Sequence, residues 1–377
     1  MNHRIGELTQ RRGEHGRVSG ATRQAIERWF VARWPHRHAI TASDFDVPGG
    51  GASSTMLSFE LSWEERGGRG GGRFILRQEP IDDPVAPRET GSFPSCVETE
   101  YRVQHALARY SRCPIAPLVG LETSPGVLGR PFYVMGLVEG DVPPTQGPNA
   151  GGFVVQLGPS QRRRLVESGL DALVAVHRVD WRAASLGRIG PSDGVSSLVA
   201  RYGELARRHL RGAAHPALDR ALAWLSEHAP ANRESVLTWG DARPGNIVFG
   251  ADGRVLAALD WELAAILPAG TDVALWLLAD HMVHEVEGVA RLPGYPTRDE
   301  QLAYYERRVG HPVADLHYWE MFSAMKIAYV IVRVVRRMQD AGQIPDGDDT
   351  MIHDNFAVRH LEAHLGHAAS ALVGVRS

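Results

Sequence analysis

The first part of the chain shows an alternation of apolar and polar residues that is typical of β-strands. The alternation is clearest over residues 55–63, where every second side chain is large and apolar. Patterns of this kind predict strands at 39–47, 55–63, 73–79, 117–123 and 131–138. Apolar residues at helical spacing instead predict helices at 21–34 and 95–110. The glycine-rich segment 64–73 separates two strands, and we expect it to form a flexible hairpin tip.

After about residue 140 the pattern changes to long stretches with helical periodicity. These stretches predict helices at 159–178, 191–210, 216–228, 270–286, 297–309, 314–340 and 347–374. A short β-rich segment, 235–262, lies between the third and the fourth helix. We therefore predict an α+β fold with a small β-rich N-terminal lobe at 21–138 and a larger helical C-terminal lobe at 139–377. Residues 1–20 are polar, and we expect a flexible N-terminal segment there.

Composition narrows the classes of function. The 41 basic residues comprise 40 arginines and one lysine, Lys326, and no glycine precedes that lysine. A Walker-type phosphate loop needs Gly-Lys-Ser/Thr and is therefore excluded. Since Lys326 lies in an apolar helical stretch, we give it no part in a mechanism and attribute the rarity of lysine to codon usage. The formal net charge of -3 and the dispersed arginines argue against nucleic-acid binding.

The sequence does not resemble that of a membrane or secreted protein. The longest apolar runs are too short to span a bilayer, and the start of the chain has no apolar signal region. Cys96 and Cys113 make neither a disulfide framework nor a zinc-binding spacing. We therefore expect a cytoplasmic protein.

Candidate functional residues are most frequent in a segment that begins with residues 239–249. Asp241 and Asn246 lie in a loop between predicted strands, and Asp260 follows the next strand. Two carboxylates and a carboxamide suit Mg²⁺, and this order of residues serves phosphoryl transfer. The alternative is an ordinary hairpin, because Asp and Asn are common in turns. The spacing of all three residues, followed by Asp272, favours the functional interpretation.

These segments resemble the aminoglycoside phosphotransferase and choline kinase-like family. Residues 239–249 resemble its catalytic loop, which usually reads His-Gly-Asp-x-x-x-x-Asn, and 258–262 resemble its metal-binding strand. Further similar segments are the nucleotide loop at 49–55, the third strand at 74–77, the first helix at 100–103, the hinge at 129–135, a helix end at 175–180 and a helix start at 270–274. The Trp-Gly-Asp form is also similar to the kinase-like domains fused to acyl-CoA dehydrogenases.

The resemblance implies a bilobal protein-kinase-like fold that binds ATP and Mg²⁺ in the cleft between its lobes. Asp241 would accept or orient the proton of the substrate hydroxyl, and Asn246 and Asp260 would hold the metal. The hinge residues Met135 and Leu137 would hydrogen-bond the adenine. The residues that would cover the phosphates from the nucleotide loop are Gly50, Gly51, Ser53 and Ser54.

Three residues of the resembling segments need separate interpretation, and two of them, Arg77 and Arg243, have alternatives. Arg77 stands where the family has a lysine; it would bind the phosphates and pair with Glu100, or it is a strand-edge charge paired with Glu79. We favour phosphate binding. Trp239 replaces the family's histidine, and we interpret it as packing that braces the loop. Arg243 either contacts the γ-phosphate or fixes the loop by hydrogen bonds.

The helical part adds residues with two interpretations each. The acidic residues are either a wall for a polycationic substrate or ordinary surface; they are Asp280, Glu285 and Glu287. His281 and Glu285 are one helical turn apart, which is a possible metal spacing that we do not favour. Four further histidines are either metal ligands or a solvated stripe, and we favour the stripe; they are His353, His360, His364 and His367. By the resemblance, His177 would brace the catalytic loop.

We expect an ATP-dependent O-phosphotransferase that acts on a hydroxyl of a small molecule, with an aminoglycoside-like compound or another antibiotic as the first acceptor class. A metabolic kinase for a hydroxyacyl, choline-like or sugar substrate is the second hypothesis. A nucleotide-binding module without catalysis is the third, and the intact Asp241, Asn246 and Asp260 argue against it. We expect no nucleic-acid or membrane partner, and both a monomer and a homodimer remain open.

Overall fold

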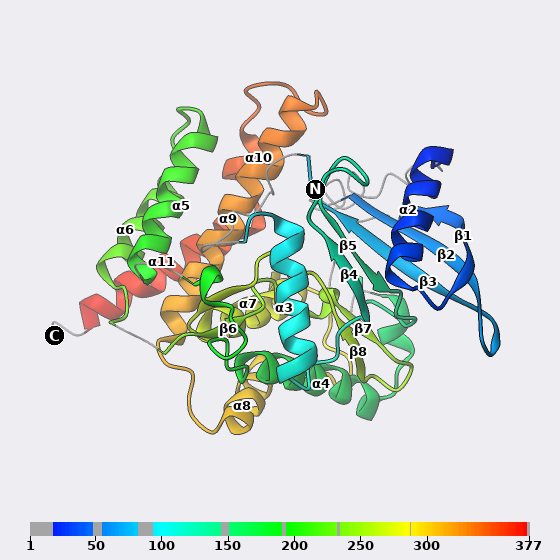
Figure 1. The fold of residues 1–377 in the computed structure, drawn as a ribbon. Helices are drawn as coiled ribbons and strands as arrows, with labels where there is room; N and C mark the ends of the chain where they lie inside the picture. Colours follow the sequence, from blue (N-terminus) through cyan, green and yellow to red (C-terminus); the bar gives the residue numbers. More distant parts are fainter. Residues whose placement is uncertain are drawn as a thin grey trace.

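The computed structural model describes residues 18–47, 55–81, 93–144, 151–190, 194–231, 234–286 and 288–374. It confirms the predicted α+β class, with an antiparallel sheet in the first part of the chain and a mostly helical second part (Figure 1). The predicted flexible segment at 1–20 lies almost wholly outside the described residues, as does the nucleotide loop with Gly50, Gly51, Ser53 and Ser54.

A five-stranded antiparallel sheet forms the first part, in the order β1-β2-β3-β5-β4. Its strands are β1 (His38–Asp46), β2 (Thr55–Glu65), β3 (Gly68–Gln78), β4 (Leu118–Glu122) and β5 (Phe132–Gly136). Helix α2 (Gly20–Arg33) covers the sheet, and its Trp29 and Phe30 pack with Phe59 and Phe74 in an aromatic core. The alternating apolar residues over 55–63 therefore lie on the face of the sheet that α2 covers.

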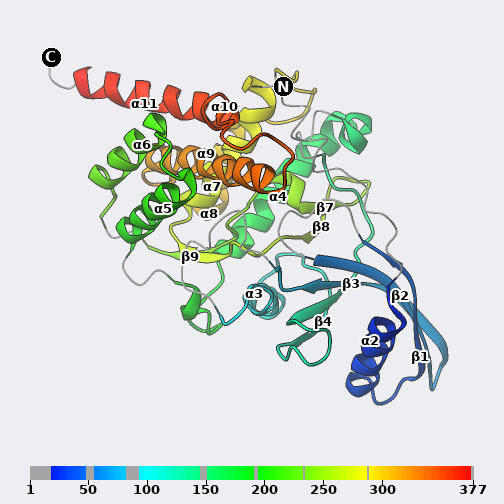
Figure 2. The same ribbon diagram turned by 90° about the horizontal axis from the view of Figure 1, so that it is seen from above.

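Helix α3 (Cys96–Tyr110) lies between the sheet and the helical part of the molecule (Figure 2). Ser95 caps its start by accepting a hydrogen bond from the Glu98 N–H (3.1 Å). The Glu79 carboxylate, just after β3, accepts further hydrogen bonds from the first N–H groups of the helix, those of Cys96 (2.8 Å) and Val97 (2.9 Å). These contacts join α3 to the end of β3 and so place Glu100 close to that strand.

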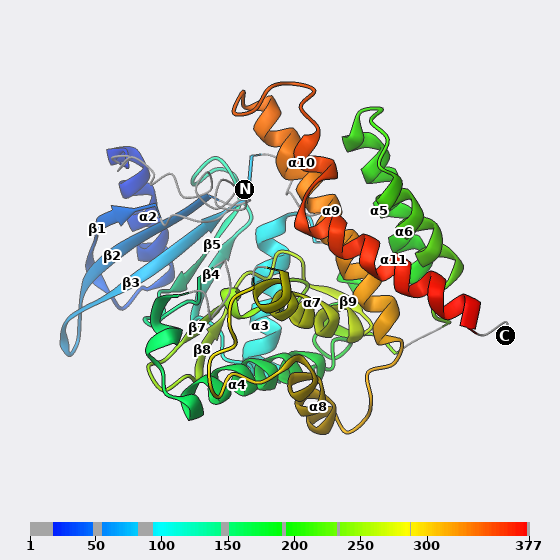
Figure 3. The ribbon, with the colours of Figure 1, turned by 180° about the vertical axis from the view of Figure 1, so that it is seen from behind.

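The second part consists of helices around short strand pairs. Figure 3 shows α11 crossing α9, with α7 beside them. The helices are α4 (Pro159–His177), α5 (Val195–Leu210), α6 (Pro216–Glu227), α7 (Gly270–His281), α8 (Arg298–Val309), α9 (Leu316–Asp340), α10 (Thr350–His353) and α11 (Phe356–Gly374). Short 3₁₀ turns lie at Gly152–Gln156, Gly187–Ile189 and Pro244–Asn246, and a π-helical turn, Met282–Val286, extends α7. The strand pairs are β6 (Val236–Thr238) with β9 (Ala265–Leu267), and β7 (Ile247–Phe249) with β8 (Val255–Ala258).

The structure corrects the sequence prediction in two places. The expected flexible tip at 64–73 is mostly strand, because β2 and β3 pair up to Glu65 and Gly68 and leave only two residues for the turn. The single helix expected at 347–374 is interrupted at Asn355. The Asn355 side chain accepts hydrogen bonds from the N–H groups of Ala357 (2.9 Å) and Val358 (3.1 Å) and thereby starts α11.

Two negative findings concern the described residues alone. Among them, no helix has both the length and the apolar character needed to cross a bilayer. Cys96 and Cys113 are both buried and are not joined in a disulfide.

The glycine run forms a strand because a glycine at position 70 leaves room for a large side chain of the neighbouring strand. Gly70 lies opposite Trp63, and a Cβ at Gly70 would come within 2.4 Å of Nε1 of that indole. The indole itself is held by Trp34 and by Arg37. We therefore expect Gly70→Val to lower the free energy of unfolding, measured by urea titration, by about 1–3 kcal/mol.

The matched control is Gly67→Val in the adjacent turn, where no atom lies within 4 Å of a built Cβ. We expect this substitution to stay within about 0.5 kcal/mol of the wild type. Equal unfolding midpoints for the two variants would contradict the packing of Trp63 on Gly70.

Candidate active site

The loop between β6 and β7 carries the catalytic-loop motif and begins with a residue that must be glycine. Gly240 has φ +84°, and a Cβ there would lie 2.1 Å from the carbonyl oxygen of Leu263. No side chain fits in that space, because the neighbouring atom belongs to the backbone. The chain therefore turns sharply at Gly240, immediately before Asp241.

Asp272, in the first turn of α7, holds this turn from one side. Its carboxylate is 1% exposed and accepts hydrogen bonds from the N–H groups of Trp239 (2.6 Å) and Gly240 (2.8 Å). His177, at the end of α4, contacts the same carboxylate through Nε2 (3.0 Å), and its Nδ1 contacts the Tyr305 hydroxyl (2.7 Å). These partners offset the desolvation of a buried carboxylate. His177 thus lies behind the loop, where the resemblance predicted a bracing residue.

Lys326, on α9, holds the same turn from another side. It is buried, and its Nζ donates a hydrogen bond to the Gly240 carbonyl (2.9 Å). This corrects the sequence interpretation, which gave Lys326 no part in the site. The two residues are 86 positions apart, so no local pattern encodes the contact. The available signal was a lone lysine in an otherwise apolar helical stretch.

The Asp241 carboxylate is held in place by two residues of the same loop, Asn246 and Arg243. Asn246 Nδ2 donates to the Asp241 carbonyl (2.9 Å) and to its Oδ2 (2.6 Å). Arg243 Nε lies 3.3 and 3.2 Å from the two carboxylate oxygens, and Asp241 raises the pKa of the Arg243 guanidinium. The Asp241 side chain keeps 26% of its surface exposed. It is therefore oriented and still accessible.

Trp239 connects this loop to the end of β8. Its indole N–H donates to the carbonyls of Leu259 (2.8 Å) and Asp260 (3.2 Å), and its ring stacks on Trp261 at 5.0 Å. Asp260 has φ +61°, a left-handed conformation that Asp tolerates better than most residues. An indole that only donates suits this position, because the two groups it contacts are carbonyls.

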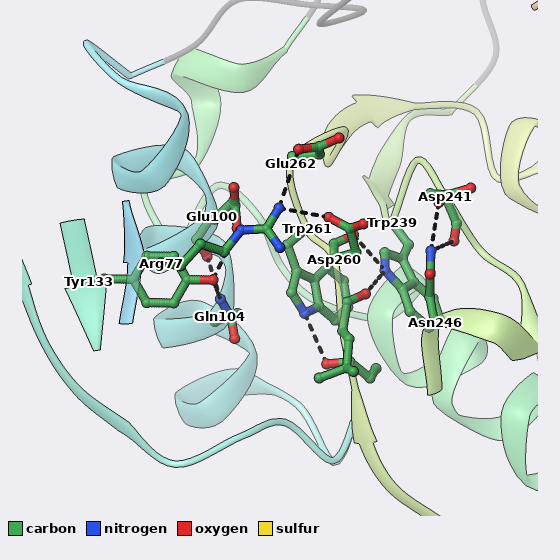
Figure 4. A network of polar contacts seen from close by, with 12 residues as sticks. Arg77, Glu100, Gln104, Tyr133, Trp239, Asp241, Asn246, Asp260, Trp261 and Glu262 are labelled. Carbon is green, nitrogen blue, oxygen red and sulfur yellow. Dashed lines mark hydrogen bonds and ion pairs between the residues drawn. The ribbon is translucent and has the colours of Figure 1, made fainter. Parts of the chain in front are cut away.

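Arg77, on β3, brings the sheet to the site (Figure 4). It is buried, and its Nε lies 2.7 Å from Glu100 Oε2 of α3. Its other end contacts Asp260 Oδ1 (2.9 Å) and Glu262 Oε2 (3.2 Å). The alternative pairing with Glu79 is wrong, because the Glu79 carboxylate caps α3.

One guanidinium thus faces three carboxylates, and this arrangement has electrostatic consequences. Burial raises the pKa of Glu100; Arg77 opposes that rise, while Glu262 and Asp260 add to it. The Tyr133 hydroxyl donates to Glu100 (3.0 Å). The cluster carries more negative than positive charge, so it favours a further cation. Glu262 and Tyr133 were not among the residues predicted for the site.

The side-chain oxygen atoms of Asn246 and Asp260, beside this cluster, suit a hard cation. Because Asn246 Nδ2 makes both hydrogen bonds to Asp241, the carboxamide Oδ1 faces away from Asp241. The Asp260 side chain is 33% exposed. A carboxamide oxygen and a carboxylate are ligands that Mg²⁺ accepts, so both residues fit the metal that the resemblance implies.

The predicted hinge lies at the end of β5. Met135 pairs with Ile75 of β3 and Leu118 of β4 inside the sheet. The Leu137 N–H donates to the Arg73 carbonyl (2.8 Å). This N–H is engaged within the sheet, which leaves the Leu137 carbonyl as the group that could contact an adenine.

Asp280 does not fit the acidic wall that the sequence suggested for a polycationic substrate. Asp280 is buried and contacts Arg291 Nη2 (2.8 Å) and Gln301 Nε2 (2.8 Å). Its charge is therefore compensated inside the protein. Glu287 lies outside the described residues.

Several known proteins are similar to this chain in sequence. Acyl-CoA dehydrogenase family member 10 of Mus musculus is 28% identical over 254 residues, which are 64% of this chain and 23% of the relative. Acyl-CoA dehydrogenase family member 11 of Gallus gallus is 28% identical over 287 residues, 71% of this chain and 34% of the relative. The chain thus spans about a quarter to a third of the length of the curated relatives it matches.

Solved structures share the fold. A candidate aminoglycoside phosphotransferase of Ralstonia eutropha superposes with a TM-score of 0.68 at 24% identity, over 92% of this chain and 98% of that one. Macrolide 2'-phosphotransferase type I gives a TM-score of 0.52 at 17% identity, over 92% and 96%. The model of the phosphotransferase enzyme family matches residues 55–317, from β2 to the start of α9. This match includes Arg77, the loop with Asp241 and the strand end with Asp260, and the chain therefore belongs to the phosphotransferase enzyme family.

Proposed function

We propose that the chain transfers the γ-phosphoryl group of ATP to a hydroxyl of a small molecule. The observation that carries this proposal is the oriented, accessible Asp241 carboxylate on a loop that Asp272 and Lys326 hold from two sides. A structural neighbour, a mutant of aminoglycoside phosphotransferase APH(4)-Ia, was solved with AMP-PNP and hygromycin B. Its TM-score of 0.54 at 14% identity shows that it shares the fold, so we propose that this chain likewise binds a nucleotide together with a small-molecule acceptor.

In this proposal Asp241 accepts or orients the proton of the acceptor hydroxyl. Phosphoryl transfer depends mainly on positioning and electrostatics, so the hydrogen bonds from Asn246 and Arg243 to Asp241 matter as much as its basicity. Arg243 holds the carboxylate and would also meet the γ-phosphate. Asn246 and Asp260 would hold Mg²⁺, which when bound offsets charge on the phosphates.

Arg77 and Glu100 would act on the nucleotide as a pair. Glu100 keeps Nε of Arg77 in place, and the opposite end of the guanidinium would turn from Asp260 toward the phosphates once a cation binds Asp260. Met135 and the Leu137 carbonyl would border the adenine. The phosphate contacts of Gly50, Gly51, Ser53 and Ser54 stay a prediction.

A second acceptor class is favoured by two observations. The inward-facing Asp280 removes part of the acidic wall that a polycationic aminoglycoside would need. The relatives named above are acyl-CoA dehydrogenase family members, at higher identity than the macrolide enzyme. We therefore place a metabolic hydroxyl compound, such as a hydroxyacyl compound, beside the antibiotics as acceptor. An ADP-release assay over both classes, with mass spectrometry of the phosphorylated product, separates them.

The first prediction tests the function itself. We expect Asp241→Asn to reduce acceptor-dependent ADP release by about 10²–10⁴-fold, since the amide cannot accept the hydroxyl proton. The rise in Tm with ATP and Mg²⁺ should persist. Asp252→Asn, in the exposed turn between β7 and β8, is the control and should retain the wild-type rate. An unchanged rate in Asp241→Asn would refute the proposed phosphotransferase mechanism.

The second prediction tests Arg77. Removing it alone would leave Glu100 buried without its cation, so we pair Arg77→Met with Glu100→Gln and use Glu100→Gln alone as the reference. We expect the double variant to raise the KM for ATP about 10–100-fold through the lost charged contact. Arg77→Lys keeps a cation and should stay within about tenfold of the wild type. Equal KM values for the Met and Lys variants would exclude a phosphate-binding role.

The third prediction tests Lys326. Lys326→Met removes the donor to the Gly240 carbonyl, and we expect a loss of about 1–3 kcal/mol in the free energy of unfolding. Because Asp241 follows Gly240 directly, kcat should fall more than the KM for ATP rises. Ile327→Met, the next residue of α9, is the control. If both variants show the same kcat, the lysine does not position Asp241.

A further inference from the structure

Histidine side chains from three helices meet at a point that the proposed reaction does not use. His317 lies in the first turn of α9, His360 and His364 lie on α11, and His281 ends α7. They come together because α9 packs against both α7 and α11 (Figure 3). Together with Glu320 of α9, three of these histidines line a hollow of about 260 Å³. The single solvated stripe predicted from the sequence does not form, because His353 belongs to α10 and contacts His215 instead.

The imidazole nitrogens and the carboxylate oxygens of this cluster lie near one another. One ligand atom each from His317, Glu320 and His364 lies within 4.8 Å of the others. The Nε2 atoms of His360 and His364 are 3.1 Å apart. In a tetrahedral zinc site with bonds of about 2.1 Å, neighbouring ligands are separated by about 3.4 Å. The pair on α11 comes near this spacing, and the hydrogen bond between its two imidazoles would be exchanged for bonds to the ion. The group within 4.8 Å does not include His360, so the His360 ring would have to turn toward His317 and Glu320.

The positions along the helices explain how four ligands can converge. His360 and His364 are four residues apart and thus lie on one face of α11, and His317 and Glu320 are three residues apart on one face of α9. Imidazole nitrogens with one carboxylate are ligands that suit Zn²⁺ and its neighbours and suit Mg²⁺ poorly.

We propose that His317, Glu320, His360 and His364 bind one divalent transition-metal ion of the zinc type. The competing group is Arg298, which forms an ion pair with Glu320. Arg298 compensates the Glu320 charge before metal binds, and the ion takes over that carboxylate or shares it through the second oxygen. His281, whose ring lies 4.6 Å from that of His360, borders the site from α7.

Such an ion would connect α9 to α11, next to α7. Helices α7 and α9 also carry Asp272 and Lys326, the residues that hold the loop at Gly240. On α7, His281 is nine residues from Asp272, about 14 Å along the helix; on α9, Glu320 is six residues from Lys326, about 9 Å. The ion would therefore fix α9, one of the two helices that hold Gly240, against α11, at a distance from Asp241. The binding of the ion does not depend on the proposed phosphoryl transfer.

The test uses the full chain, freed of metal with a chelator and titrated with Zn²⁺ by calorimetry, with Mg²⁺ as the comparison ion. We expect one Zn²⁺ per chain and a rise in Tm of about 3 °C at a hundredfold excess over Kd. His317→Gln and His364→Gln should each weaken Zn²⁺ binding at least tenfold. His105→Gln, an exposed histidine on α3, should leave it unchanged.

Binding that persists in both variants, or no saturable binding, would overturn the proposal. X-ray absorption of the wild-type zinc complex provides a readout that needs no variant. Imidazole and carboxylate ligands around zinc would support the site, and a shell of oxygen ligands alone would overturn it. All these measurements detect the ion directly, so they stand even if the chain transfers no phosphate.

Discussion

The hydrogen bonds of the buried Asp272 carboxylate are the interaction on which the site depends. Two of its partners are consecutive backbone N–H groups, those of Trp239 and Gly240, so it fixes the direction in which the loop leaves β6. The left-handed turn at Gly240 then determines where Asp241 points. Lys326 holds the carbonyl of the same glycine from α9. A buried anion and a buried cation thus contact one residue from two helices, one at its N–H and the other at its carbonyl.

Arg77 provides the corresponding link between the sheet and the helical part. It is anchored by Glu100 on α3 and reaches Asp260 and Glu262 at the end of β8. Since one cation faces three carboxylates, this link is strongest when no other cation is near Asp260. A metal ion at Asp260 would compete for the same oxygen and release the guanidinium. The charge imbalance would therefore couple occupation of the proposed metal site to the position of Arg77.

What the sequence could predict follows from how far apart the contacting residues are. The loop with Asp241 and Asn246 was recognisable because its residues lie within one short segment, and the strands because apolar residues alternate along them. The strand at Gly70 was missed because its reason is Trp63 on the neighbouring strand, and glycine alone indicates a turn. The break at Asn355 was missed because one capping side chain decides it. The histidine cluster joins α9 to α11, and only the packing of the helices brings these residues together.

The same reasoning explains why one lysine stands among forty arginines at position 326. A guanidinium carries five N–H donors in a fixed plane, whereas an ammonium carries three on a compact centre. The buried Arg336, on the same helix, illustrates the difference: it contacts the carbonyls of His209 and Leu210 and the side chains of Gln339 and Asp349. Lys326 is also buried and reaches the Gly240 carbonyl. A guanidinium there would have to bury additional donors, and unpaired buried donors are destabilising. The lysine is thus explained by the shape of the site it supports, rather than by codon usage alone.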